Sequence, residues 1–165
     1  GWLDLFQKHR LPVHIFRLAG IYGPGRNAIE QVRAGTARRI VKPGQVFSRI
    51  HVHDIAQTLM ASIARPNPGA AYNLADDEPA APQAMVEHAC KLLGAPPPPE
   101  EPFETAKLSE FARSFYSENK RVRNERIKRE LGVRLRYPDY REGLRSFMDP
   151  VAFAASKADQ GRSQG

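Results

Sequence analysis

Residues 13–26 of this 165-residue chain read Val13-His-Ile-Phe-Arg-Leu-Ala-Gly-Ile-Tyr-Gly-Pro-Gly-Arg26. The β-branched and aromatic residues at its start predict a short strand over residues 13–18, buried on both faces. Further along, Gly23-Pro24-Gly25 excludes regular structure, because proline lacks a backbone donor and glycine favours turns. We therefore expect a buried strand that leads into a turn-rich segment over residues 20–25.

Helix and strand patterns alternate on both sides of this stretch. Helical patterns cover residues 1–10, 28–34, 54–63, 82–93, 105–117, the basic segment before Gly132, and 139–147, whereas strand patterns cover residues 39–42, 46–52 and 71–75. Strands separated by helices predict an α/β fold with parallel pairing. Because so few strands are well marked, we expect an incomplete sheet with an exposed apolar edge.

Composition narrows the class of protein. Hydrophobic residues make up 41% and charged residues 26%, which is compatible with a packed core. The sequence has no apolar run of about 18 residues, the length that a membrane-spanning helix needs. Its start, Gly1-Trp2-Leu3-Asp4, lacks the features of a signal peptide. A single cysteine, Cys90, rules out an internal disulfide and fits a reducing cytoplasm; its amphipathic helix predicts a packing role.

Positive charge is concentrated in one segment. The net charge is +7, and residues 119–136 hold eight basic and two acidic residues. Ile127 and Leu131 are four residues apart and share one helical face, which predicts a docked helix with a solvated basic side. Contact with a phosphate or another anionic partner is the alternative. The apolar residues interleaved here are aliphatic, which argues against a nucleic-acid surface.

Three other patterns could carry chemistry. His51 and His53 point to the same side of a strand and could share a metal, but no third ligand has suitable spacing. Tyr116 and Lys120 have the spacing of an acid–base pair, which is common by chance. Arg49, at a strand end, suits either an anionic ligand or a surface ion pair. Asp54 is expected to cap the helix that follows, with Gln57 reaching back to it.

Several segments in order resemble motifs of one family. Phe16–Arg26 resembles the segment Arg-Pro-x-Asn-Val-Tyr-Gly-Pro-Gly, and Arg49–Ala56 resembles Arg-Asp-x-x-His-Val-x-Asp-x-Ala. Ala71–Asp76 resembles the strand x-Tyr-Asn-Val-Gly, and Asn119–Gly132 resembles the later Lys-x-x-x-x-Leu-Gly element. Over residues 11–145 the chain thus resembles the extended short-chain dehydrogenase/reductase family, the NAD-dependent epimerase/dehydratases.

The resemblance implies a fold and indicates which functional residues lie outside this chain. It implies an α/β fold, the C-terminal half of a Rossmann-like doubly wound parallel sheet with a small, mostly helical substrate lobe over residues 1–150. Residues 154–165 are expected to form a disordered tail. The family's Tyr-x-x-x-Lys pair and Gly-rich nucleotide loop would lie upstream of residue 1, so Tyr116 and Lys120 match by coincidence. We therefore expect no catalytic residue and no metal site in this chain, and no activity from it alone.

The resemblance also assigns roles to particular positions. Leu18, Ala19 and Gly20 match the strand end that lies against the nicotinamide of NAD or NADP. Arg49 matches an arginine that binds substrate phosphate, and Arg26 with Asn27 is expected to line the pocket. The parent enzyme would transfer hydride to or from nicotinamide, act on a small substrate that is anionic or nucleotide-linked, and form a homodimer. The rival hypothesis is a stand-alone module that binds an anionic partner through residues 120–136.

Overall fold

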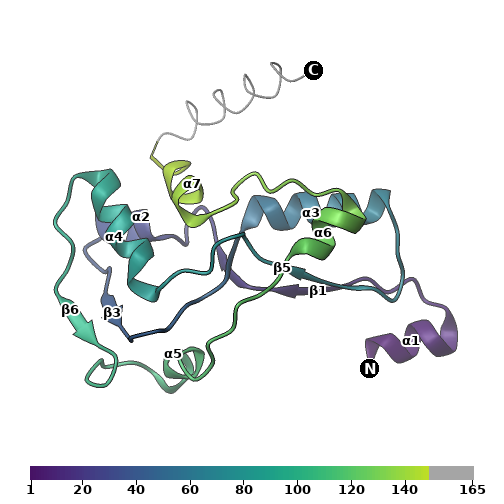
Figure 1. Cartoon of the computed structure of the whole chain (residues 1–165), viewed down its shortest axis with the longest axis horizontal. Coiled ribbons are helices and arrows are strands. Elements are labelled where there is room, and N and C mark those ends of the chain that lie inside the picture. The colour runs from purple at the N-terminus through teal and green to yellow at the C-terminus, as the bar shows by residue number, and fades with distance from the viewer. Residues whose placement is uncertain (149–165) are drawn as a thin grey trace, which may run out of the picture.

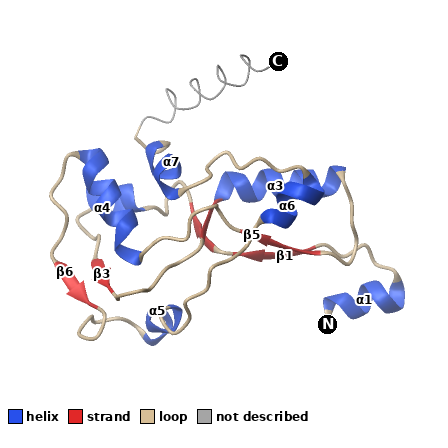
Figure 2. Cartoon of the chain, viewed as in Figure 1, coloured by secondary structure: helices blue, strands red, loops and turns tan. Residues whose placement is uncertain are grey.

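The computed structural model describes residues 1–148, so the predicted tail over residues 154–165 lies outside the described part. Helices and strands are interleaved along it up to the last strand, which three helices follow (Figures 1 and 2). The helices are α1 (Trp2–His9), α2 (Ala28–Arg33), α3 (Val52–Ala64), α4 (Pro82–Leu93), α5 (Glu110–Phe115), α6 (Glu125–Leu131) and α7 (Tyr140–Arg145). The strands are β1 (Ile15–Leu18), β2 (Gly20–Tyr22), β3 (Arg39–Val41), β4 (Arg49–His51), β5 (Ala71–Leu74) and β6 (Glu100–Pro102).

Within residues 1–148 the strands form three parallel pairs, β1 with β5, β2 with β4, and β3 with β6. The predicted parallel pairing is therefore confirmed, but the strands are divided among three small sheets. The division begins at Ala19, the single residue between β1 and β2. Before it, Leu18 lies opposite Leu74, and after it, Gly20 lies opposite Arg49. The chain thus changes partner strand within two residues.

Three strands differ from expectation. β1, predicted to be buried on both faces, is half-buried at Ile15 and Phe16 and exposed at Arg17 and Leu18, because only β5 pairs with it among residues 1–148. Residues 20–22, predicted as part of a turn, form β2, because β4 supplies a partner that no local pattern reveals. Residues 100–102 form β6 directly after the proline run, paired with β3. Both segments take their structure from partners distant in the sequence.

The helices agree with the sequence patterns more closely. α4 occupies the whole predicted range, and Gly94 ends it in the left-handed conformation that favours glycine. α5 and α6 are shorter than expected, since α5 starts after its cap at Ser109 and α6 covers only the middle of the basic segment. Among residues 1–148, no helix has the length and apolar character needed to cross a membrane.

Two apolar clusters hold these elements together. Helices α3 and α6 lie on one side of the β1–β5 pair (Figure 2). Between them is a cluster that includes Ile50, Leu74 and Ile127, each fully buried. The second cluster joins α2, α4 and α7 through residues such as Ile29 and Leu144.

Asp54 has a different role from the predicted helix cap. α3 begins at Val52, and its cap is His51, whose Nδ1 accepts a hydrogen bond from the backbone of His53 at 3.1 Å. The buried Asp54 carboxylate instead accepts from the backbone N–H groups of Arg136 at 2.7 Å and Tyr137 at 3.0 Å. Asp54 therefore ties the start of α3 to the segment that follows α6.

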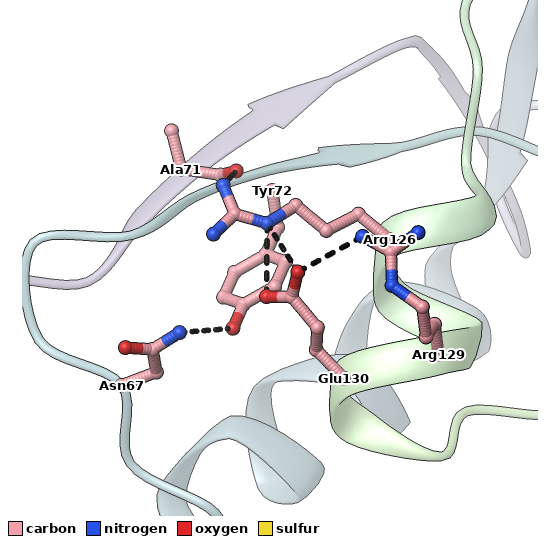
Figure 3. Close-up of polar contacts among 6 residues, drawn as sticks. All are labelled: Asn67, Ala71, Tyr72, Arg126, Arg129 and Glu130. Carbon is pink, nitrogen blue, oxygen red and sulfur yellow. Dashed lines mark hydrogen bonds and ion pairs between the residues drawn. The ribbon is translucent and has the colours of Figure 1, made fainter.

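A polar clamp fixes α6 along the outer edge of β5 (Figure 3). Arg126 donates from Nη1 to the carbonyl of Ala71 at 2.9 Å and from Nε to Glu130 at 2.9 Å. Its guanidinium lies over the ring of Tyr72, 5.0 Å from the centroid. The Tyr72 hydroxyl in turn receives a hydrogen bond from Asn67. A charged helix thereby closes a sheet edge that would otherwise expose backbone groups.

Candidate functional site

A cavity of about 770 Å³ lies beside the carboxyl end of β1 and the adjoining β2 and β4. In open parallel sheets, ligands bind in crevices outside the carboxyl ends of the strands. Five of the six residues predicted from the sequence line this cavity: Leu18, Ala19, Gly20, Arg26 and Arg49. Positions up to 31 residues apart in the sequence thus converge on one space.

The backbone N–H groups of Ala19 and Gly20 form hydrogen bonds within the fold. Residues 18–20 therefore offer the cavity side chain and backbone surface and not N–H donors. The N–H of Ala19 donates to Leu74 O at 3.0 Å, and that of Gly20 donates to Ser48 O at 3.1 Å. The Leu18 side chain is 46% exposed. Residues 18–20 therefore form an apolar wall suited to the face of a planar ligand.

Arg49 lines the cavity, but its donors are engaged within the fold. Its guanidinium donates to the carbonyl oxygens of Phe47 at 3.0 Å, Ala80 at 3.1 Å and Ala81 at 3.4 Å. Burial lowers the pKa of Arg49, and the negative charge of Asp76 opposes that shift. The residue braces β4 against the segment that follows β5, which is a structural role.

Arg26 and Asn27 behave differently from each other. Arg26 is exposed at the cavity, and its guanidinium has no hydrogen bond or ion pair to any residue of the described range 1–148. Asn27 is buried and does not line the cavity, so the expectation for this residue is wrong. Its Oδ1 accepts from the N–H of Glu30 at 3.0 Å, and its Nδ2 donates to Gly23 O at 3.0 Å. The local reason is that an Asn before an apolar run is a strong helix cap.

The rest of the cavity wall combines aromatic, aliphatic and hydroxyl side chains with one acidic and one basic residue. Phe47 and Tyr116 pack edge to face with centroids 5.2 Å apart. Phe115, on α5, lines the cavity and is 56% exposed. Lys120 also lines it and pairs with Glu118 at 2.6 Å. An anionic ligand with a planar or apolar body fits such a wall.

At the cavity is a buried group of titratable side chains, Tyr22, His51 and Asp76, whose association no sequence motif predicted. The ring of Tyr22 packs edge to face against His51, with centroids 5.1 Å apart. Burial, reinforced by Asp76, raises the pKa of the Tyr22 hydroxyl. Burial and the neighbouring His53 lower the pKa of His51 to about 3. Tyr22 and His51 are therefore both uncharged at neutral pH.

Asp76 lies two residues after the end of β5 and is 2% exposed. Burial raises the pKa of Asp76 to about 7, and the positive charge of Arg49 acts against that rise. Its backbone N–H donates to Arg49 O at 2.6 Å. Only the neighbouring strand motif could have drawn attention to Asp76, because the burial that shifts its pKa comes from tertiary packing.

The remaining candidate patterns take structural roles. Tyr116 follows α5 and Lys120 lies outside any helix, so the pair is not one helical turn apart. His51 and His53 have ring centroids 4.9 Å apart, yet among residues 1–148 no three His, Cys, Asp or Glu side chains are placed to hold a metal ion. Cys90 is 1% exposed in α4, and burial raises the pKa of its thiol.

The basic segment is partly neutralised by its neighbours. Arg126 and Arg129 pair with Glu130 at 2.9 and 3.2 Å, and Lys128 pairs with Asp77 at 2.5 Å. These charges lie at the surface, and their pairing reduces the positive field that an anionic partner would meet. α6 is therefore a docked helix whose basic side chains are engaged in ion pairs.

No family model matches the chain, and no curated protein is significantly similar to it. Its fold is similar to that of a conserved protein of unknown function from Silicibacter pomeroyi, with a TM-score of 0.80, 63% identity, and coverage of 84% of this chain and 49% of that one. A dTDP-glucose 4,6-dehydratase from Bacillus anthracis, in complex with NAD, aligns at 17% identity and a TM-score of 0.67, covering 92% and 49% of the two chains.

The enzyme WbmF of Bordetella bronchiseptica, in complex with NAD⁺ and UDP, gives a TM-score of 0.66 at 20% identity and covers 97% of this chain and 54% of that one. This chain spans about half the length of each of these structures. The chain therefore has the fold of about half of each of these structures, two of which are enzymes solved with NAD, and at the level of the fold this agrees with the resemblance of its motifs.

Proposed function

We propose that this chain is the C-terminal, substrate-side half of an NAD(P)-dependent oxidoreductase or epimerase of the extended short-chain dehydrogenase/reductase type. The nicotinamide would supply the hydride chemistry. A Tyr/Lys acid–base pair and a Gly-rich nucleotide loop would come from the other half. The chain by itself is therefore inactive.

The cavity beside the end of β1 carries the proposal. It brings together Leu18, Ala19 and Gly20, the residues assigned to the nicotinamide, with Arg26, an unpaired cation among residues 1–148. An exposed cation beside an apolar wall suits a ligand that has both a planar ring and an anionic group. A motif match alone would not explain why residues from three separate strands and a loop share one space.

We propose different roles for two arginines of the cavity, both of which the resemblance assigned to the substrate site. Arg26 would hold the anionic group of a small or nucleotide-linked substrate, because its donors are not engaged elsewhere in residues 1–148. Arg49 would affect substrate binding only by stabilising the fold, since its guanidinium already donates hydrogen bonds to three backbone carbonyls. Substrate affinity would then depend on Arg26 directly and on Arg49 through stability.

The test uses this chain alone and a chimera. In the chimera, the chain replaces the matched portion of the S. pomeroyi protein, whose unmatched portion is kept. A panel of sugar nucleotides is offered with NAD⁺ or NADP⁺. Nicotinamide absorbance records a net oxidation, and chromatography of the sugar nucleotides records an epimerisation or dehydration, which returns the hydride to the product. We expect turnover by the chimera only, and Arg26→Met should raise KM with kcat unchanged. Arg33→Met, an exposed arginine outside the cavity, is the matched control.

Two outcomes would overturn the proposal. A folded chimera that binds neither NAD(H) nor NADP(H) would remove the oxidoreductase assignment. Turnover by the isolated chain would show that it does not need another half. Nucleic-acid binding that weakens steeply with salt would favour the rival module, although the ion pairs of α6 give that reading less support.

A further inference from the structure

Three buried side chains that adjoin one another hold polar atoms without a partner. Tyr22 lies opposite His51 in the β2–β4 pair, and the N–H of Asp76 donates to Arg49 O, two residues before His51. The Tyr22 hydroxyl, Nε2 of His51 and both carboxylate oxygens of Asp76 are buried and form no hydrogen bond within residues 1–148. Buried polar groups are hydrogen-bonded as a rule, because one without a partner costs stability. This group therefore needs an explanation beyond packing.

Helix α7 and the residues that flank it cover two of these side chains. A Cβ on Gly143 would overlap the Tyr22 hydroxyl, so the backbone of α7 lies directly on that oxygen. Phe147, two residues after the end of α7, stacks on the ring of His51 with centroids 5.5 Å apart and the ring planes 20° from parallel. The partnerless atoms of Tyr22 and His51 are thus enclosed by the last helix of the described range.

The third side chain, Asp76, faces charges from several elements. Burial raises the pKa of Asp76 to about 7, and the negative charges of Asp77 and of Asp139, the cap of α7, act in the same direction. The positive charge of Arg49 and the N–H of Glu78 oppose the rise, although neither donates a hydrogen bond of ordinary geometry to the carboxylate. Closure of α7 adds the charge of Asp139 and further burial, and so favours the neutral carboxyl group.

His51 is affected in the opposite sense. Burial lowers the pKa of His51 to about 3, and the neighbouring His53 and Arg136 contribute to the decrease. Three aromatic rings pack around the imidazole, those of Tyr22, Tyr137 and Phe147. The closed fold therefore holds His51 without a charge, whereas an imidazole in water takes up a proton near its ordinary pKa of 6.5.

The contacts of α7 allow it to move separately from the rest of the fold. The segment before it is fixed as far as Pro138, whose carbonyl accepts from the N–H of Asp77 at 2.8 Å. The helix itself is six residues long, and its apolar face carries the fully buried Leu144. Arg141 adds a surface ion pair to Glu78, at 2.6 and 2.8 Å. A short terminal helix with so few contacts belongs among the least stable parts of a fold.

From this arrangement we propose that α7 is a lid over Tyr22, His51 and Asp76, and that lifting it replaces a neutral pair by a charged one. Under the closed lid Asp76 carries a proton and His51 carries none. In the open state Asp76 releases its proton to water and His51 takes one up, so between about pH 4 and 6.5 no net proton is exchanged. Tyr22 also lines the cavity, so lifting the lid loosens one residue of the cavity wall.

Amide hydrogen exchange of the full chain tests whether α7 opens by itself. Amides of α7, such as that of Gly143, are compared with amides of α4 after correction for intrinsic rates. We expect α7 to exchange faster than α4 and to respond less to low urea concentrations, because local opening exposes little surface. Glu78→Gln removes the partner of Arg141 and should lower the protection of α7 about twofold to fivefold, with α4 unchanged. Glu104→Gln, at an exposed position, is the matched control.

The pH dependence of the same exchange tests the pair under the lid. In the unchanged chain the protection of α7 should stay nearly constant between about pH 4 and 6.5, because the two contributions cancel. Asp76→Asn leaves the contribution of His51, so protection should rise with pH by up to about tenfold per unit. His51→Asn keeps a side-chain acceptor at the cap of α3 and should give the opposite slope.

Two results would overturn the lid. Equal protection and equal urea dependence in α7 and α4 would mean that α7 opens only when the whole chain unfolds. Parallel pH profiles of the unchanged chain and Asp76→Asn would mean that lifting α7 does not expose the pair, and this comparison holds even where His51→Asn fails to fold. Cofactor binding enters neither measurement, so the lid and the proposed function can fail independently.

Discussion

The guanidinium of Arg49 donates to the carbonyl oxygen of Ala80 at 3.1 Å, which joins β4 to the segment beyond β5. The same nitrogen reaches Phe47 O at 3.0 Å. Arg49 is 8% exposed, and its bonds add to the backbone pair in which Phe47 O accepts from Ala80 N–H at 3.1 Å and Ala80 O accepts from Phe47 N–H at 2.9 Å. The arginine that the motif assigned to substrate phosphate is thus part of the framework of the cavity.

Replacing Arg49 should therefore cost stability. Arg49→Met would remove the charge-assisted hydrogen bonds that join β4 to residues 80–81, although the carbonyls keep their backbone donors, and we expect the unfolding free energy to fall by about 1–3 kcal/mol. Arg26→Met removes an exposed side chain whose guanidinium has no hydrogen bond or ion pair within residues 1–148 and should change stability by less than about 0.5 kcal/mol. Urea denaturation of both variants is the measurement, and equal losses would contradict the distinction.

The buried Asp76 and His51 should make opposite contributions to the pH dependence of stability. Asp76 has a pKa of about 7 in the fold against 3.8 for an ordinary aspartate, so the folded state binds the extra proton and this contribution falls as pH rises through that window. His51 has a pKa of about 3 against 6.5, so its contribution rises with pH. In the native protein the two slopes offset each other.

Asp76→Asn removes the contribution of Asp76 to the pH dependence of the unfolding free energy. The contribution of His51 should then be measurable. Relative to the unchanged protein, we expect the unfolding free energy of the variant to rise with pH by up to ~1 kcal/mol per pH unit between about pH 4 and 7. Urea titrations at several pH values measure this difference. Glu104→Gln, at an exposed position, is the control. Parallel curves for Asp76→Asn and the unchanged protein would refute the shift.

Gly143 has a packing role in α7. A Cβ at this position would overlap the hydroxyl and ring of Tyr22. An alanine gains helix propensity of about 0.5–1 kcal/mol, but overpacking costs roughly 1–3 kcal/mol, so Gly143→Ala should be destabilising. Adding Tyr22→Phe removes one of the overlapping atoms and should recover part of the loss. Thermal denaturation measures both changes. A Gly143→Ala protein that is more stable than the unchanged one would contradict the close packing of Gly143 against Tyr22.

Cys90 should be unreactive in the folded chain. It is 1% exposed, and burial raises the pKa of its thiol, which leaves little thiolate for reaction. We expect slow labelling by an aromatic disulfide reagent in buffer and fast labelling in urea. Rapid labelling of the native protein would mean that α4 opens or that the thiol is accessible.

Local patterns in the sequence predicted those elements that depend on interactions between residues close in the chain. The strand at β1, the helix α4 with Gly94 at its end, and the cap of α7 at Asp139 all depend on residues close in the chain. β2 and β6 were missed because their partners lie far away in the sequence. Gln57 reaches back to the Asp54 carboxylate at 2.7 Å as predicted, but Asp54 does not cap α3, and its backbone partners are 82 and 83 residues away.

The candidate site shows the same limit. The family resemblance located five residues that line the cavity, because motif positions carry over one by one. It could not separate Arg26 from Arg49, since that distinction depends on the carbonyls around each guanidinium. It also missed the group formed by Tyr22, His51 and Asp76, whose pKa shifts come from burial and not from spacing.

The central claim is that this chain forms half of a nicotinamide-binding enzyme, and a calorimetric titration tests it most directly. NADH and NADPH are titrated into the chimera with the unmatched portion of the S. pomeroyi protein and into the isolated chain. We predict saturable binding of at least one cofactor by the chimera and none by the isolated chain. A chimera that is folded and monodisperse but binds neither cofactor would contradict the claim.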